Sequence, residues 1–169
     1  YFSHSPKEAD VYPGDSIDIL AGLDINEFGG KRTAQLILRD LRLTADAAAV
    51  AEANAARYAA LRAGAPAPGA DIVPSREEFG AVYNFIRRQV RFGEDSFTVR
   101  EMLMRDEHVG AVGYIKLRFI IDVLYELNIV GVESLGHEAY RFRVSYQPKR
   151  ADLDKSAILR RLRAQTRAE

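Results

Sequence analysis

Side chains suited to catalysis are few and scattered in this 169-residue sequence. Its three histidines, His4, His108 and His137, lie too far apart in the sequence for the short spacings typical of zinc sites. Cysteine is absent, which excludes disulfides, a cysteine nucleophile and cysteine-ligated metals. Adjacent acids such as Asp106 and Glu107 fit helix starts, where carboxylates interact favourably with the helix dipole. We therefore predict no catalytic residue, cofactor or metal site in this chain.

Cationic and amide side chains, in contrast, are placed where they could hold an anionic partner. The formal net charge is zero, but residues 141–169 carry nine Lys and Arg against three acids, a net +6. Residues 1–43 carry five Lys and Arg against seven acids, a net −2. Because a partner meets local charge, the basic C-terminal end is a candidate surface for nucleic acid.

Residues 23–42, LDINEFGGKRTAQLILRDLR, predict a β-hairpin around a Gly-Gly turn. Gln35, Ile37 and Arg39 alternate with Leu36 and Leu38, which gives the second strand a polar face and an apolar face. The candidate nucleic-acid contacts of this hairpin are Asn26, Lys31, Arg32, Gln35 and Arg39. Such side chains hold single strands on OB-type sheets; the alternative is a solvated face whose charges deter edge pairing. Because two or three strands make a marginal sheet, we expect further strands before residue 1, and a chain that is part of a longer protein.

Residues 44–74 predict a connection between two domains. The Ala-rich segment 44–63 favours a surface or bridging helix, which Thr44 or Asp46 could cap and Gly64 could close. Residues 64–74, GAPAPGADIVP, lack periodicity and predict a linker. The predicted organisation is therefore α+β, with OB-like strands in 1–43, a bridging helix and linker in 44–74, and a last domain in 75–169.

Residues 75–169 predict a winged-helix-like domain with a C-terminal helix. Ser75 and Glu78 have the spacing of a capping box. A short helix follows, and the segment 112–128 predicts a longer helix that Asn128 could end. Two strands, 129–134 and 139–146, come next, and Asp152 or Asp154 could cap the last helix. The buried stripe expected on the longer helix is Leu117, Ile120, Ile121, Leu124 and Leu127.

The longer helix occupies the place at which a winged helix contacts DNA bases and phosphates. The candidate contacts of this domain are Tyr114, Lys116 and Arg118 on the helix, Arg141 and Arg143 on the wing, and Lys149, Arg150, Arg160 and Arg161 in the tail. Asp122 and Glu126 lie on the same helix and would repel phosphates. The alternative is that this domain packs against another domain or protein and does not touch DNA.

Several stretches resemble the RecJ family of single-stranded-DNA-specific exonucleases. Residues 12–43, with NEFGGKRTAQLILRDLR at their centre, resemble the closing strands of the family's OB domain. The stretches VPSREEFGAVYNFIRR, LYELNIVGVE, YRFRV and KRADLDKSAILRRLR resemble the C-terminal domain of the longer, firmicute-type members. The resemblance runs from about residue 11 to residue 163 and is weakest in the Ala-rich helix and the linker.

This resemblance implies a non-catalytic C-terminal part of a 5′–3′ exonuclease that acts in DNA recombination and repair. The catalytic core of the family is a DHH phosphoesterase with two divalent metals, manganese or magnesium. This sequence contains no Asp-His-His triplet, so no catalytic residue is carried over. The family's strand-holding role falls on Asn26, Arg32, Gln35 and Arg39.

The implied partners are single-stranded DNA, the single-strand-binding protein or other repair proteins, and the N-terminal catalytic domains. We expect a cytoplasmic location and no membrane partner, because the sequence has no apolar run of membrane-spanning length. The alternative function is a winged-helix protein-interaction module that does not bind DNA.

Overall fold

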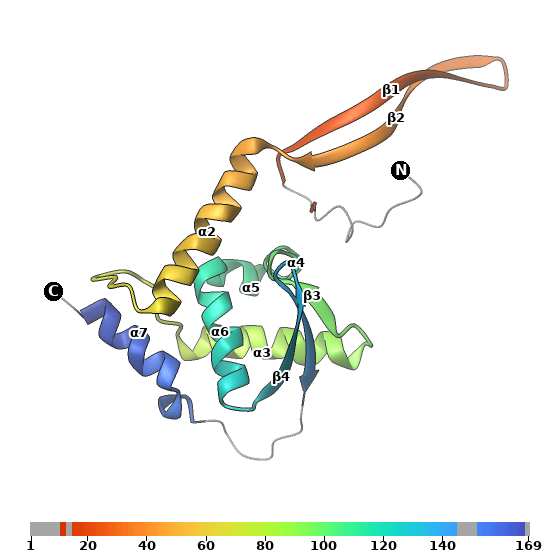
Figure 1. Cartoon of the computed structure of the whole chain (residues 1–169). Coiled ribbons are helices and arrows are strands. Elements are labelled where there is room, and N and C mark those ends of the chain that lie inside the picture. The colour runs from red at the N-terminus through yellow and green to blue at the C-terminus, as the bar shows by residue number, and fades with distance from the viewer. Residues whose placement is uncertain (1–10, 13–14, 145–151, 168–169) are drawn as a thin grey trace. The chain divides into compact units, whose positions relative to one another are not determined.

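The computed structural model describes residues 11–12, 15–144 and 152–167, and the α+β class predicted from the sequence is confirmed (Figure 1). The chain divides into two units, residues 1–53 and residues 54–169. We call the first the hairpin unit and the second the compact unit. In the described part of the chain, no helix is both long enough and apolar enough to cross a bilayer.

The hairpin unit contains strands β1 (Ile17–Phe28) and β2 (Lys31–Leu43), which pair antiparallel. The predicted hairpin is therefore confirmed. Gly29 and Gly30 form its turn with φ of 60° and 73°. Two consecutive residues with positive φ fit the tight turn that matches the twist of paired strands, and glycine adopts that backbone without a steric cost.

A β-bulge at Arg39 sorts the side chains of the hairpin into two faces. Leu20 pairs with Asp40 but Ala21 pairs with Leu38, so Arg39 is one extra residue on β2. Side chains alternate between faces with a period of two, so the extra residue shifts the alternation by one. The leucines before and after the bulge therefore lie on the same face. The resulting apolar face comprises Ile17, Ile19, Ala21, Leu23, Ile25, Ala34, Leu36, Leu38, Leu41 and Leu43.

The apolar face of the hairpin is open to solvent. Leu23 is 75% exposed and Leu36 is 68% exposed. Within the hairpin unit, no described residue covers these side chains. An isolated two-stranded sheet is at best marginally stable in water, and this one exposes large apolar side chains.

The described residues of the compact unit form the second half of α2 (Ala45–Ala63), five further α-helices, a 3₁₀ turn and a three-stranded antiparallel sheet in the order β3-β5-β4. The helices and the turn are α3 (Arg76–Arg91), α4 (Val99–Arg105), α5 (Glu107–Val112), α6 (Tyr114–Glu126), η1 (Leu153–Lys155) and α7 (Ala157–Arg167). The strands are β3 (Ser96–Thr98), β4 (Val130–Gly136) and β5 (Ala139–Val144).

Local capping signals predicted most helix ends correctly. The Ser75–Glu78 capping box is present, with Ser75 N donating to Glu78 Oε2 at 2.6 Å. Asn128 follows α6 with φ of 53°, the expected left-handed conformation. The last helix differs from the prediction, because Asp152 caps η1 instead. Ser156 caps α7, with its Oγ accepting from Leu159 N at 3.1 Å.

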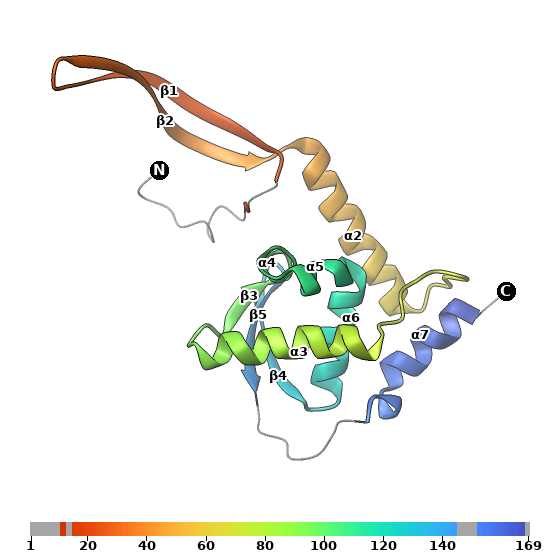
Figure 2. The same cartoon turned by 180° about the vertical axis from the view of Figure 1, so that it is seen from behind.

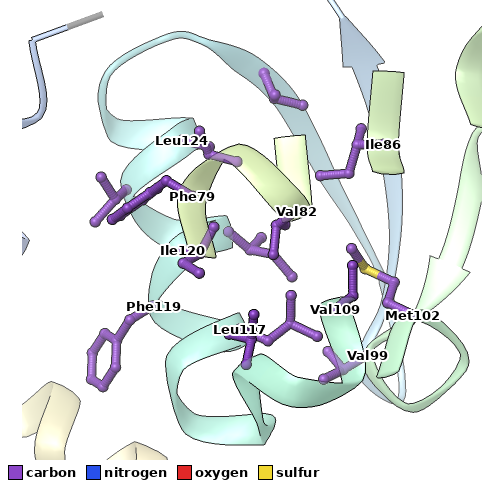
Figure 3. Packing of buried hydrophobic residues seen from close by; sticks show 14 of the residues in the cluster. Phe79, Val82, Ile86, Val99, Met102, Val109, Leu117, Phe119, Ile120 and Leu124 are labelled. Carbon is purple, nitrogen blue, oxygen red and sulfur yellow. The ribbon is translucent and has the colours of Figure 1, made fainter. Parts of the chain in front are cut away.

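The core of the compact unit surrounds α6 on two sides. Leu117, Ile120 and Leu124 point into the main core with residues of α3, α4 and α5 (Figure 3). Phe119 points away from that group in the same view, and its ring centroid lies 5.1 Å from that of Tyr58 on α2. Because α6 buries apolar side chains on both of these sides, other elements must cover each side. Helix α6 therefore needs a second cover.

Residues 54–74 supply part of that cover and do not form a free linker. Tyr58, Leu61 and Ile72 are buried core residues. Gln165 on α7 donates from Nε2 to the carbonyl oxygens of Leu61 at 2.8 Å and Ala65 at 2.7 Å. The predicted helix over 44–63 is present as α2. The segment 64–74 differs from the predicted linker, because partners far along the chain tie it to the core.

Two glycines on helices of the compact unit give a matched test of its packing. A Cβ on Gly110 in α5 would lie 2.7 Å from the Leu103 carbonyl oxygen, whereas a Cβ on Gly80 in α3 has no neighbour within 4 Å. Gly110→Ala should therefore lower the free energy of unfolding by about 1–3 kcal/mol. Gly80→Ala should raise it by about 0.5–1 kcal/mol through helix propensity. Urea unfolding followed by circular dichroism measures both, and equal effects of the two variants would contradict the α4–α5 packing.

Candidate nucleic-acid interface

The polar face of the hairpin carries four of its five predicted contact residues. Gln35 lies opposite Asp24, and its Nε2 donates to Asp24 Oδ2 at 3.5 Å. Arg39 lies over Gly22, with its Nε 3.4 Å from the place of a Cβ there. Gly22 pairs with Ile37, so the predicted shared face of Gln35, Ile37 and Arg39 is confirmed. Asn26 and Lys31 complete the group, which we call the polar face group: Asn26, Lys31, Gln35 and Arg39.

Arg32 lies on the other face of the hairpin. It pairs in register with Glu27 at the tip, and its Nε is 3.8 Å from Glu27 Oε2. Asp18, Asp24 and Asp40 in turn share the polar face with the polar face group. The cations of this face are therefore interleaved with acids, and an anionic strand would meet its strongest attraction at Lys31 and Arg39.

The positive charge of Lys116 on α6 is compensated by two acids of the compact unit. Its Nζ lies 2.8 Å from Asp71 Oδ2 and 2.9 Å from Glu78 Oε1, and its side chain is 13% exposed. Burial opposes the charged form, but these two hydrogen bonds outweigh it and raise the pKa of the Lys116 amine. Lys116 thus links Asp71, before α3, and Glu78 on α3 to α6.

Arg118 lies at the centre of a ring of aromatic side chains, which we call the Arg118 cluster: Arg118, Tyr58, Tyr114, Tyr140 and Glu138. The guanidinium carbon is 4.1 Å from the Tyr58 ring centroid, 5.6 Å from that of Tyr114 and 5.9 Å from that of Tyr140. Arg118 also forms an ion pair with Glu138 and donates to Tyr114 Oη at 2.7 Å. Its side chain is 13% exposed, so these contacts occupy the guanidinium.

The phenols of the Arg118 cluster are held in their protonated form. Burial raises the pKa of Tyr58 above its ordinary value, and the hydrogen bond that Tyr58 donates to Asp122 raises it further. Burial likewise raises the pKa of Tyr114, together with the hydrogen bond that Tyr114 donates to Glu138. Uncharged phenols stabilise the cluster, because a phenolate would be repelled by the neighbouring carboxylates.

The two acids of α6 hold other helices of the same unit. Asp122 accepts from Tyr58 Oη and lies 3.6 Å from Arg62 Nε, both on α2. Glu126 accepts from Ser156 Oγ and, at 2.9 Å, from Ala157 N at the start of α7. The side of α6 that carries these acids and Arg118 therefore faces its own chain.

The predicted contacts that the structure describes on the wing and the tail lie at the surface. Arg141 lies 3.7 Å from Asp95 and 3.6 Å from Glu133. Arg143 lies 3.3 Å from Glu133, with 76% of its side chain exposed. Arg160 and Arg161 are exposed on α7. Lys149 and Arg150 lie outside the described residues.

The contact between Tyr58 on α2 and Phe119 on α6 was not predicted from the sequence. The readable signal was Phe119 and Val123, which lie four residues apart on the side of α6 opposite the predicted stripe, and both are buried. A second apolar stripe requires a second layer, and α2 is the nearest preceding helix. Within residues 11–12, 15–144 and 152–167, no group of three or more His, Asp or Glu side chains could hold a metal ion.

Comparison with known proteins leaves the chain without a family assignment. No family model, no curated protein and no solved structure matches it. The geometry of the two units is therefore the basis for the functional proposal.

Proposed function

We propose that this chain is a non-catalytic C-terminal part of a RecJ-like single-stranded-DNA-specific 5′–3′ exonuclease, in which it contributes DNA grip and partner docking. The catalytic chemistry belongs to a DHH core elsewhere in the parent protein, where manganese or magnesium would act. Its partners are single-stranded DNA, the N-terminal catalytic domains and repair proteins such as the single-strand-binding protein.

The observation that carries this proposal is the division of the hairpin into a polar face and an apolar face. A bulge maintains the apolar face on both of its sides, from the Ile17–Leu43 pair to the Ile25–Ala34 pair. In an OB-type barrel the apolar face points inward and the outer face holds the strand. The exposed Leu23 and Leu36 fit a barrel wall whose remaining strands belong to the parent's OB domain.

The compact unit supports a winged-helix arrangement. Its central part runs helix, strand, helix, helix, helix, strand, strand, and the sheet order β3-β5-β4 places the first strand beside the last. In this arrangement α6 is the helix that would enter a major groove. We infer that α6 serves packing in this protein, because Lys116 and Arg118 are paired with acids of their own unit.

The same pairing favours docking as the second function of the compact unit. Because its own chain covers α6, the wing and the outer face of α3 are the surfaces left for contact. The alternative, a pure protein-interaction module, follows if these surfaces bind proteins and the hairpin binds nothing.

Neutralising one cation on each face of the hairpin tests the grip directly. Arg39→Gln removes a charge from the polar face, and Arg32→Gln removes an equal charge from the other face. Fluorescence anisotropy with a labelled single-stranded oligonucleotide should show a several-fold weaker affinity for Arg39→Gln and a salt slope reduced by about 0.7. Arg32→Gln should change the affinity less than about twofold. Equal effects of both variants would contradict the assignment of DNA binding to the polar face. If the wild-type chain binds no oligonucleotide, the proposed DNA-binding role is contradicted.

A further inference from the structure

Helix α3 carries a basic surface that none of the predicted contacts includes. Its buried stripe, Phe79, Val82, Phe85 and Ile86, faces the core. Asn84, Arg87 and Arg91 follow at intervals of three and four residues on the opposite side of the helix, and all three are exposed. Figure 2 shows α3 along the outside of the compact unit. With Phe92 at the helix end, these residues form what we call the α3 stripe: Asn84, Arg87, Arg91 and Phe92.

The cations of the α3 stripe are available to a partner. The neighbouring Arg88 is taken by Asp106, with Nη2 to Oδ2 at 2.6 Å. Arg87 packs over the Tyr83 ring, with its guanidinium carbon 5.9 Å from the centroid. Among the described residues, neither Arg87 nor Arg91 has an acidic partner. This sets them apart from Lys116, Arg118 and Arg141, whose charges are already compensated.

Phe92 presents an exposed ring from a hydrogen-bonded backbone at the end of α3. Its side chain is 77% exposed, although its backbone N–H donates to the carbonyl oxygens of Arg88 at 3.2 Å and Gln89 at 2.9 Å. The ring lines an open hollow of about 830 Å³ with Asn84, Arg87, Arg88 and Arg91. An exposed aromatic ring beside uncompensated guanidinium groups is the combination with which proteins hold single-stranded nucleic acid.

We propose that the α3 stripe binds single-stranded nucleic acid. Arg87 and Arg91, one helical turn apart, contact successive phosphates. Phe92 stacks on an unpaired base, and the Asn84 amide donates to or accepts from a base edge. A duplex keeps its bases stacked on one another, so it cannot use Phe92. This inference rests on the proposed function for the choice of ligand and adds a second contact, on the compact unit.

Anisotropy with a labelled single-stranded oligonucleotide and the full chain tests the proposal. Arg87→Gln/Arg91→Gln should weaken binding at least tenfold at low salt and reduce the salt slope by about 1.4, which is 0.7 for each lost phosphate contact. Phe92→Leu should weaken binding at least fivefold and leave the salt slope unchanged, because stacking on a base carries no counterion release. All four side chains are exposed, and circular dichroism verifies that each variant is folded.

The matched control is Arg57→Gln/Arg76→Gln, which removes the same charge from exposed positions elsewhere on the compact unit. It should change the affinity less than about twofold. If the stripe variants behave like this control while Arg39→Gln weakens binding, the α3 stripe is overturned and the proposed function stands. If the wild-type chain binds no oligonucleotide, the proposed function fails as well. An acidic peptide that binds the wild-type chain more tightly than the oligonucleotide, with Phe92→Leu abolishing that binding, would assign the stripe to a protein partner and overturn the proposal.

Discussion

Arg118→Ala is expected to lower the free energy of unfolding of the compact unit by about 2–3 kcal/mol. The substitution leaves Glu138 without its ion-pair partner and removes the stacking on Tyr58, whose ring centroid is 4.1 Å from the guanidinium carbon. Breaking a buried pair costs about 3–5 kcal/mol, and the partial exposure of Glu138 places this case below that range. The chain has no tryptophan, so urea unfolding is best followed by circular dichroism.

Two variants separate the Arg118 cluster from general charge effects. Arg118→Lys keeps the charge but lacks the planar guanidinium that stacks on aromatic rings and donates several hydrogen bonds. It should therefore lose only about half as much stability as Arg118→Ala. Arg143→Ala removes an equal charge from the exposed wing and should change stability by less than about 0.5 kcal/mol. A loss for Arg118→Ala no larger than that of Arg143→Ala would show that α6 is not held by this cluster.

The compact unit is expected to lose stability steeply in alkaline solution. The pKa values of Tyr58 and Tyr114 are raised in the folded chain, whereas free tyrosine ionises near about pH 10. The unfolded chain therefore releases these protons first as the pH rises. The stability that the two phenols contribute is fully present below about pH 10 and is lost as the pH rises through the folded pKa values.

Urea unfolding at neutral pH and at about pH 11 measures this loss. Tyr58→Phe should be less stable than wild type at neutral pH by about 1 kcal/mol, because it lacks the hydrogen bond to Asp122. Its further loss at high pH should be smaller than that of wild type. Tyr125→Phe, which changes an exposed tyrosine on α6, is the control and should follow the wild-type pH dependence. Identical pH dependence for all three proteins would contradict the protonated phenols of the cluster.

Local structure could be predicted from the sequence because its causes lie within a few residues. The Ser75–Glu78 capping box, the Gly-Gly turn and the left-handed Asn128 each depend on one short segment. The alternation of Gln35 and Leu36 likewise predicted both faces of β2. The bulge had a readable sign as well, since Leu38 and Leu41 are three residues apart where strict alternation requires two.

Long-range partners could not be predicted in this way. Tyr58 meets Asp122 across 64 residues of sequence, and Gln165 meets Leu61 across 104. No local pattern indicates which acid neutralises Lys116, so its candidacy as a DNA contact rested on helix position alone. The α3 stripe was missed although its cause is local. The apolar periodicity of α3 was sufficient to predict the helix, and exposed arginines are common on helices.

The most direct measurement of the central claim is single-stranded oligonucleotide binding by this chain in the presence of manganese. Anisotropy at increasing salt gives the affinity, and a denaturing gel of the same samples gives the length of the strand. We predict that the oligonucleotide binds, that the affinity falls linearly with salt on logarithmic axes, and that the strand stays intact. A shortened strand would contradict the non-catalytic role, and the absence of binding at low salt would contradict the DNA grip.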